Sequence, residues 1–142
     1  MAKNNYGSRY APWIREILDH RECTVAMRQV LGILGWHVGK SQAISGDQMI
    51  QQLQHLGWIG DVDRQFRDQI NKLRKLQAVI CSAGGPGGGY WIPDGPAEFE
   101  EYLQHELHSR AMDLLEQEKQ MRAAAERIWG KYSPEHQLRL EL

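Results

Sequence analysis

The residues with the most specific hydrogen-bonding chemistry in this chain lie in one expected helix, residues 61–76. The planar side chains of Arg and Asn can form paired hydrogen bonds with the edges of guanine and adenine, whereas Lys and Arg neutralise phosphates at any sequence. The candidate DNA-binding residues are Arg64, Arg67, Asp68, Asn71, Lys72, Arg74 and Lys75. We expect Arg64, Arg67 and Asn71 to face bases and the remaining cations to face phosphates. A charged helix face that contacts only solvent is the alternative.

The same helix has an apolar face, which fixes the direction of the polar one. The apolar residues recur at helical spacing and are Val62, Phe66, Ile70 and Leu73. Asp61 can cap the first turn of this helix. The preceding helix, from Gly46 to about Leu56, opens with a capping box of Ser45 and Gln48 and ends before Gly57. Two helices joined by a short turn are therefore expected to hold the polar face outward.

A glycine-rich hairpin is expected after the polar helix. Residues 78–82 contain β-branched side chains and predict one strand, and Tyr90-Trp91-Ile92 predicts a second. Between them lies AGGPGGG, whose glycines supply the positive φ angles of a hairpin tip. The tip contains no Lys or Arg, so only its backbone N–H groups could contact a phosphate.

Two helices are expected at the N-terminal end. Apolar spacing predicts a short helix from Pro12 to about Arg21, with Pro12 in its first turn. A second helix is expected from about Thr24, which can cap it, to Val38. Two glycines weaken this prediction, and VLGIL is also compatible with a buried strand.

The order helix, helix, turn, helix and hairpin is that of a winged helix. The segment RQFRDQINKLRKLQAVICSAGGPGGGYWIP resembles the recognition helix and wing of small winged-helix (helix-turn-helix) DNA-binding proteins of phages, mobile elements and bacterial repressors. The matching features are Ile70 with Leu73-Arg74, the strand Val79–Ser82, and Gly88-Gly89-Tyr90. The resemblance covers about residues 24–93. It implies a mainly α fold with a small β-hairpin, and binding of double-stranded DNA.

A long helix is expected from Pro96 to about Trp129, where no Gly or Pro interrupts the chain. A heptad seam runs along it, with one polar member. The seam consists of Leu107, Ala111, Leu114, Glu118, Met121, Ala125 and Ile128. A narrow apolar seam on an acidic helix needs a partner, so we expect a coiled-coil homodimer; a different protein partner on this helix is the alternative.

These elements predict four parts of the chain. They are an N-terminal segment with a short helix at 1–23, a winged-helix domain at 24–93, a long dimerisation helix at 94–132 and a C-terminal tail at 133–142.

The distribution of charge agrees with one basic and one acidic side. The net charge is −1 overall. Residues 1–40 carry six Lys/Arg against three Asp/Glu, residues 61–75 five against three, and residues 94–128 four against nine. One face suited to DNA and another turned away from it would follow from this asymmetry.

Several features argue against other classes of protein. The two cysteines, Cys23 and Cys81, are far apart in sequence, and neither a signal peptide nor a membrane span is visible, so a cytoplasmic protein is expected. Cys23 precedes a helix N-terminus, a position that can lower a thiol pKa. GWHVGKS has three residues between its glycines where a phosphate-binding loop needs four. HELH places its second His one residue early for a zinc motif. We therefore expect no catalytic residue, no metal, no cofactor and no enzymatic activity.

The sequence thus predicts a sequence-specific, duplex-DNA-binding homodimer. A transcriptional regulator and a phage or mobile-element replication or packaging factor both fit this description. The alternative is a winged-helix adaptor that binds protein and does not read DNA.

Overall fold

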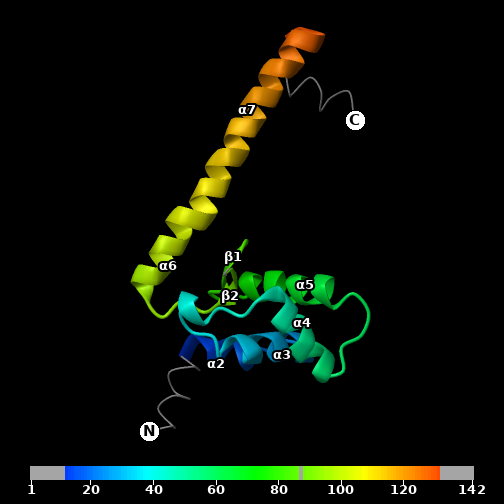
Figure 1. Ribbon diagram of the computed structural model, residues 1–142, viewed down its shortest axis with the longest axis vertical. Coiled ribbons are helices and arrows are strands. Elements are labelled where there is room, and N and C mark those ends of the chain that lie inside the picture. Colours follow the sequence, from blue (N-terminus) through cyan, green and yellow to red (C-terminus); the bar gives the residue numbers. More distant parts are fainter. Residues whose placement is uncertain (1–11, 87, 132–142) are drawn as a thin grey trace. The chain divides into compact units, whose positions relative to one another are not determined.

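The computed structural model describes residues 12–86 and 88–131. They are mainly helical, with one small two-stranded antiparallel sheet and a long C-terminal helix (Figure 1). The chain divides into two compact units, residues 1–101 and 102–142, which are described separately.

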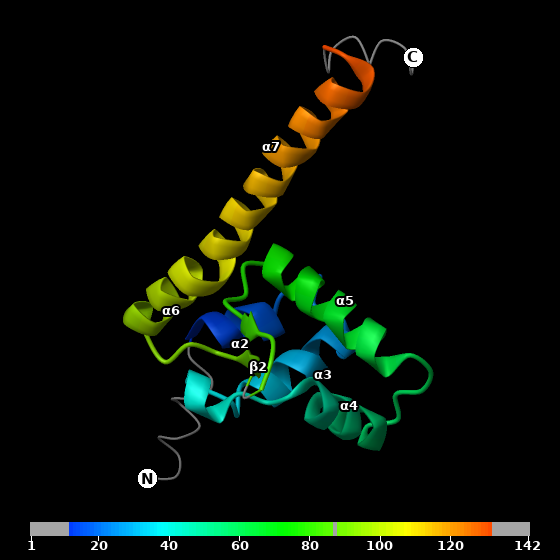
Figure 2. The same ribbon diagram turned by 45° about the horizontal axis from the view of Figure 1, so that its top comes forward.

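The first unit contains most of the elements. In chain order they are α2 (Pro12–Leu18), α3 (Val25–Leu34), the short 3-10 helix η1 (Lys40–Gln42), α4 (Gly46–His55), α5 (Val62–Lys75), β1 (Cys81–Ala83), β2 (Gly89–Trp91) and α6 (Pro96–Tyr102), whose last residue begins the second unit. Helix α5 packs against α3 and α4, and α2 packs against α3 (Figure 2). Their apolar faces form one core, from Ile14 and Ile17 of α2 to Ile92 after β2.

Three helices begin at the capping residues that the sequence predicts. The Thr24 hydroxyl accepts a hydrogen bond from the backbone N–H of Met27 at 3.2 Å. Ser45 and Gln48 form the reciprocal capping box, with both bonds at 3.1 Å. The Asp61 carboxylate accepts from the N–H of Arg64 at 3.2 Å. Each bond satisfies a backbone donor that the first helical turn would otherwise leave unpaired.

Helix α3 ends at Leu34, so the predicted extension to Val38 is wrong, and VLGIL is helical rather than a strand. The residues after α3 instead pair with the chain that follows β2. The N–H of Ile92 donates to the carbonyl of His37 at 2.8 Å, and the N–H of Gly39 donates to the carbonyl of Ile92 at 2.7 Å. This pairing joins segments more than 50 residues apart, and a local helical pattern could not reveal it.

The hairpin is present, with strands that are shifted from their predicted positions. Cys81 pairs with Trp91 and Ala83 with Gly89, so the strands are 81–83 and 89–91 rather than 78–82 and 90–92. Residues 76–78 instead form the turn that closes α5. The N–H of Ala78 donates to the carbonyl of Leu73 at 3.0 Å, and Gln77 adopts a positive φ of 73°. Such a left-handed residue commonly closes a helix.

A third extended segment borders the hairpin at Ile44. Ile44 and Tyr90 exchange two backbone hydrogen bonds of 2.9 Å, which form an antiparallel bridge. Gly89, with φ of 144°, lies against this segment: a Cβ atom there would be 2.3 Å from the Ile44 carbonyl oxygen. Gly89 is therefore required for close backbone approach, and the bridge ties the start of α4 to β2.

The second unit is helical throughout its described part. After α6, residues Leu103–His108 form a π-helical segment (η2), and Ser109–Trp129 form α7. The π segment was not expected, because the sequence there contains no Gly or Pro. The seam residue Leu107 lies inside it, so the regular heptad spacing in α7 begins at Ala111. The tail 133–142 lies outside the described residues.

Candidate nucleic-acid interface

Helix α5 has the two faces that the sequence predicts. Val62, Phe66, Ile70 and Leu73 are at most 3% exposed and belong to the core. The residues expected to contact DNA lie away from this face, and all except Arg74 are exposed. Removing an exposed side chain from α5 therefore does not open a cavity in the core, so contact and stability can be tested separately.

Two of the exposed cations of α5 are paired with acidic residues one turn earlier. Arg67 contacts the Asp63 carboxylate at 2.7 Å, and the Lys72 ammonium lies 3.6 Å from the Asp68 carboxylate. All four side chains are about half exposed or more, and surface pairs of this kind contribute about 0–1 kcal/mol each. Such weak pairs can open when a phosphate competes for the cation. Asp68 thus serves in the structure as the partner of Lys72.

Arg64, Asn71 and Lys75 are the remaining exposed candidates on the polar face. Within residues 12–86 and 88–131, neither Arg64 nor Lys75 forms an ion pair. The spacing from Arg64 to Asn71 is two helical turns, so their side chains project in nearly the same direction. A ligand along the helix could therefore meet one guanidinium and one amide on the same side.

Arg74 differs from the other candidates because its guanidinium is directed to the fold itself. Its Nε and Nη2 atoms donate to the carbonyl of Ile80 at 3.2 and 2.8 Å, and Nη2 also donates to the Ser82 hydroxyl at 3.2 Å. The side chain is only partly exposed. Arg74 therefore fastens the loop after α5 to the end of the helix, which is a role that the sequence analysis did not anticipate.

Tyr90 adds a residue that the sequence analysis did not include in the site. Its ring and that of Phe66 form a T-shaped contact, with a centroid distance of 5.4 Å and an interplanar angle of 83°. Burial raises the pKa of the phenol, and the nearby Arg67 opposes this shift. Tyr90 therefore lies within electrostatic range of the polar face of α5. The Gly-Gly-Tyr sequence was a signal for the strand, but not for this proximity.

The segment that resembles a phosphate-binding loop has other contacts. The Lys40 ammonium lies 5.9 Å from the centre of the Trp91 ring, and the Lys40 N–H donates to the Glu98 carboxylate at 3.1 Å. The other Glu98 oxygen accepts from the N–H of Asp94 at 3.2 Å. The Glu98 carboxylate thus already accepts the hydrogen bond from the backbone N–H that a phosphate would need. Its bond to Asp94 also orients the start of α6.

Among the described residues, the cysteines and histidines form no metal-binding cluster. Burial raises the pKa of Cys23, so the lowered value suggested by its place before a helix is wrong. Burial, followed by the charge of Glu98, raises the pKa of Cys81 to about 12. Over residues 12–86 and 88–131, no group of three or more His, Cys, Asp or Glu side chains is arranged to hold a metal ion.

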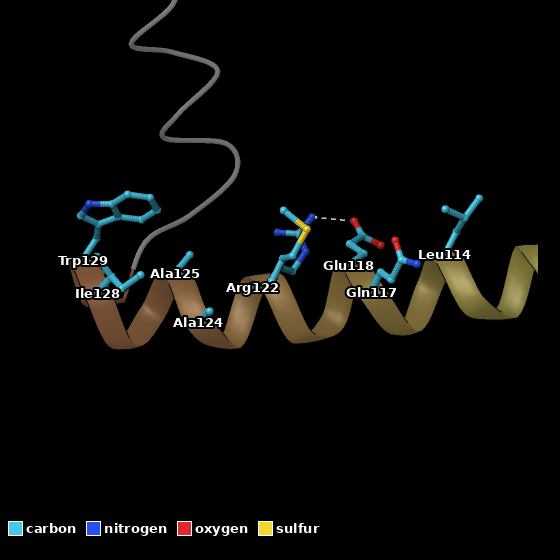
Figure 3. Close-up of a pocket in the computed structure, with 9 residues that line it drawn as sticks. Leu114, Gln117, Glu118, Arg122, Ala124, Ala125, Ile128 and Trp129 are labelled. Carbon is cyan, nitrogen blue, oxygen red and sulfur yellow. Dashed lines mark hydrogen bonds and ion pairs between the residues drawn. The ribbon is translucent and has the colours of Figure 1, made fainter.

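A second surface of interest runs along α7. Its apolar side chains are largely exposed: Leu114 is 64% exposed, Met121 72% and Ile128 62%. Trp129, which the predicted seam omits, is also exposed, and with Ala125 and Leu114 it borders a shallow groove on the helix surface (Figure 3). We call Ala111, Leu114, Glu118, Met121, Ala125 and Ile128 the α7 stripe; all are exposed except Ala125, which is partly exposed. A stripe of this kind favours burial against another surface.

Glu118 within the α7 stripe is paired on its own helix. Its carboxylate accepts a hydrogen bond from Arg122 at 3.0 Å, as Figure 3 shows. In the single chain, the Glu118 carboxylate therefore already has a cationic partner. Both side chains remain about half exposed, so each can also contact a group on a second helix.

Comparisons with protein-family models, curated proteins and solved structures find no match for this chain. In the described part of the chain, no helix combines the length and apolar character needed to cross a membrane.

Proposed function

We propose that residues 24–93 form a winged helix-turn-helix domain, and that the protein binds double-stranded DNA sequence-specifically as a homodimer. In this proposal α5 enters the major groove, which admits one α-helix. Arg64, Arg67 and Asn71 contact base edges, while Lys72 and Lys75 contact phosphates. A transcriptional regulator and a replication or packaging factor of a phage or mobile element would both use such an activity.

The observation that carries this proposal is the exposed polar face of α5 beside a hairpin. The helix is fixed on its other side by four core residues and packs against α4, and its Gln65 side chain donates to the Ile59 carbonyl in the preceding turn at 2.7 Å. The bridge between Ile44 and Tyr90 ties the start of α4 to the hairpin. A rigid helix with one free face and planar donors along it suits base recognition.

The homodimer in this proposal forms through α7. The α7 stripe exposes several large apolar side chains to solvent, although the first unit already has a core of its own. Burial of these side chains against a second copy would remove that apolar surface from water. Each Å² buried would stabilise the dimer by about 25 cal/mol. Dimerisation would also double the number of contacts with DNA.

A protein-binding adaptor is the second candidate, and two observations favour it. Arg67 and Lys72 already have acidic partners, which lowers the positive potential of α5. The turn before α5 exposes Leu56 and Ile59, at 51% and 83%, and exposed apolar side chains are more typical of a protein interface than of one with DNA.

Substitutions on α5 separate the two candidates. After selection of a preferred duplex from a random library, Asn71→Ala should change the preference among sites by about 1–3 kcal/mol per half-site. Lys75→Ala should weaken all duplexes alike, because every sequence presents the same phosphates. Arg127→Ala is the matched control, since it removes one exposed cation from the side of α7 away from the stripe.

Thermal unfolding of each variant guards against a loss of fold that would mimic a loss of contact. If Asn71→Ala and Lys75→Ala both bind the selected duplex as the parent does, α5 does not enter DNA. The adaptor would then be the better proposal.

A further inference from the structure

We propose that two copies pair through α7 in the antiparallel orientation, with Ala111 of one copy facing Ile128 of the other. This inference rests on the proposed homodimer and adds its orientation and register. Three independent properties of α7 support it: the sizes of the facing side chains, the position of Glu118 and Arg122, and the distribution of charge along the helix.

The sizes of the side chains in the α7 stripe are complementary when one helix is reversed. A two-fold axis between residues 119 and 120 pairs Ala111 with Ile128 and Leu114 with Ala125. Each alanine then faces a large aliphatic side chain, and the layers have similar widths. A parallel pair would instead place alanine against alanine in two layers and large against large in the layers beside them. Close packing favours large against small.

The polar member of the stripe also favours the reversed arrangement. In a parallel pair, Glu118 would face Glu118 of the second copy, and like charges so close are destabilising. In the antiparallel pair Glu118 faces Met121, and Arg122 of the second copy lies one residue further along. Both Glu118 and Arg122 could then form ion pairs within and between copies, as their half-exposed side chains allow.

The charge along the helical segment changes sign one residue before the proposed two-fold axis. Residues 102–118 contain four Asp/Glu and one Arg, whereas residues 119–131 contain four Lys/Arg and one Glu. Packed helices lie about 8–10 Å apart, which is close to the screening length of about 8 Å at physiological ionic strength. An antiparallel pair therefore gains attraction at both ends, and a parallel pair has repulsion at both. The two helix dipoles are opposed in the antiparallel pair, so they also attract each other.

The orientation has a consequence for DNA binding. In the antiparallel pair, the two Ser109 residues lie 21 positions apart, or about 32 Å along the axis at 1.5 Å per residue. The two DNA-binding units are then attached at opposite ends of the helical pair. A parallel pair would attach both units at the same end, an arrangement that suits two adjacent half-sites on DNA.

Disulfide capture in the full-length protein tests the orientation. Leu114→Cys and Ala125→Cys are prepared as separate proteins and oxidised with glutathione, alone and as a mixture. In the antiparallel pair, residue 114 of one chain faces residue 125 of the second chain. The two residues 114 are then about 16 Å apart along the axis. Since a disulfide needs Cβ atoms about 3.5–4.5 Å apart, only the mixture should give the cross-linked dimer. The parent chain is the control, because its Cys23 and Cys81 are buried.

Sedimentation of the parent chain measures whether a dimer forms, and the cross-linking pattern measures its orientation. The two claims can therefore fail separately. A dimer in which each single variant cross-links with itself would be parallel, which overturns the orientation and leaves the dimer intact. A monomer at tens of micromolar would overturn both the dimer and its orientation, even if the selected duplex is still bound. A dimer that forms neither kind of cross-link would be held together elsewhere, which also overturns the inference.

A charge exchange provides a second test that adds no cysteine. Glu118→Arg would place two arginines beside each other across an antiparallel interface, and should weaken the dimer about tenfold. The double variant Glu118→Arg with Arg122→Glu exchanges the two charges and should restore the dimer. In a parallel pair, Glu118→Arg only replaces one like-charge contact by another, so an unchanged dissociation constant would contradict the inference.

Discussion

Replacing Arg74 by alanine tests whether this residue holds the fold together or contacts DNA. In the structure its guanidinium donates twice to the Ile80 carbonyl and once to the Ser82 hydroxyl. The alanine variant loses these bonds and leaves the carbonyl of a residue that is only 4% exposed without this donor. We therefore expect the loop between α5 and β1 to loosen and the protein to become less stable.

The expected loss is about 2 kcal/mol. Hydrogen bonds from a charged donor contribute about 1.5–3 kcal/mol each when buried, and a buried acceptor left unpaired costs about 1–3 kcal/mol. The Arg74 side chain is partly exposed, which places the total near the lower end of these ranges. With a urea dependence of about 1–3 kcal/mol per molar, the unfolding midpoint should fall by about 1 M.

Urea unfolding at one fixed protein concentration measures this loss, because dimerisation makes apparent stability depend on concentration. Lys75→Ala is the matched control, since Lys75 is the cation next to Arg74 and is exposed. Its replacement should change the free energy of unfolding by no more than about 0.5 kcal/mol. An Arg74→Ala variant as stable as the parent would refute the structural role. If that variant also bound the selected duplex more weakly, Arg74 would be a DNA contact as the sequence alone suggested.

Two further predictions concern the hairpin and the α7 stripe. Gly89→Ala should destabilise the protein by about 3 kcal/mol, because the new Cβ would meet the Ile44 carbonyl and the positive φ would be strained; urea unfolding measures this, with Gly95→Ala as the control in open space. An unchanged Gly89→Ala midpoint would mean that β2 does not approach Ile44 closely. Glu118→Leu should tighten the dimer but make its orientation less uniform, since a charged group in an interface is exchanged for an apolar one. Sedimentation and the cross-linking pattern measure both effects, and a weaker dimer would show that the Glu118 ion pairs contribute more than the added apolar contact.

The features predicted well from the sequence are those set by nearby residues. Thr24, Ser45 and Asp61 cap their helices because a cap needs only the next three residues. The apolar face of α5 follows from the same local periodicity. The exposure of most of its candidate contact residues follows as a consequence.

The features that were missed depend on segments that meet only in the folded chain. The end of α3 depends on the pairing of residues 37–39 with Ile92. The role of Arg74 depends on the path of the chain after α5, which places the Ile80 carbonyl within reach of the guanidinium. The environment of Tyr90 depends on the packing of β2 against Phe66. None of these contacts has a spacing pattern that the sequence could display.

The most direct test of the proposed function is the salt dependence of binding to a selected duplex. Four cations of α5 in each copy are available for phosphates or bases: Arg64, Arg67, Lys72 and Lys75. Each neutralised phosphate contributes about −0.9 to the slope of log K against log salt, so a dimer should give a slope of magnitude about 3 or more. Selection that enriches a preferred duplex, followed by a steep slope, is the predicted result. Failure to enrich any duplex, or an affinity that does not change with salt, would contradict the account.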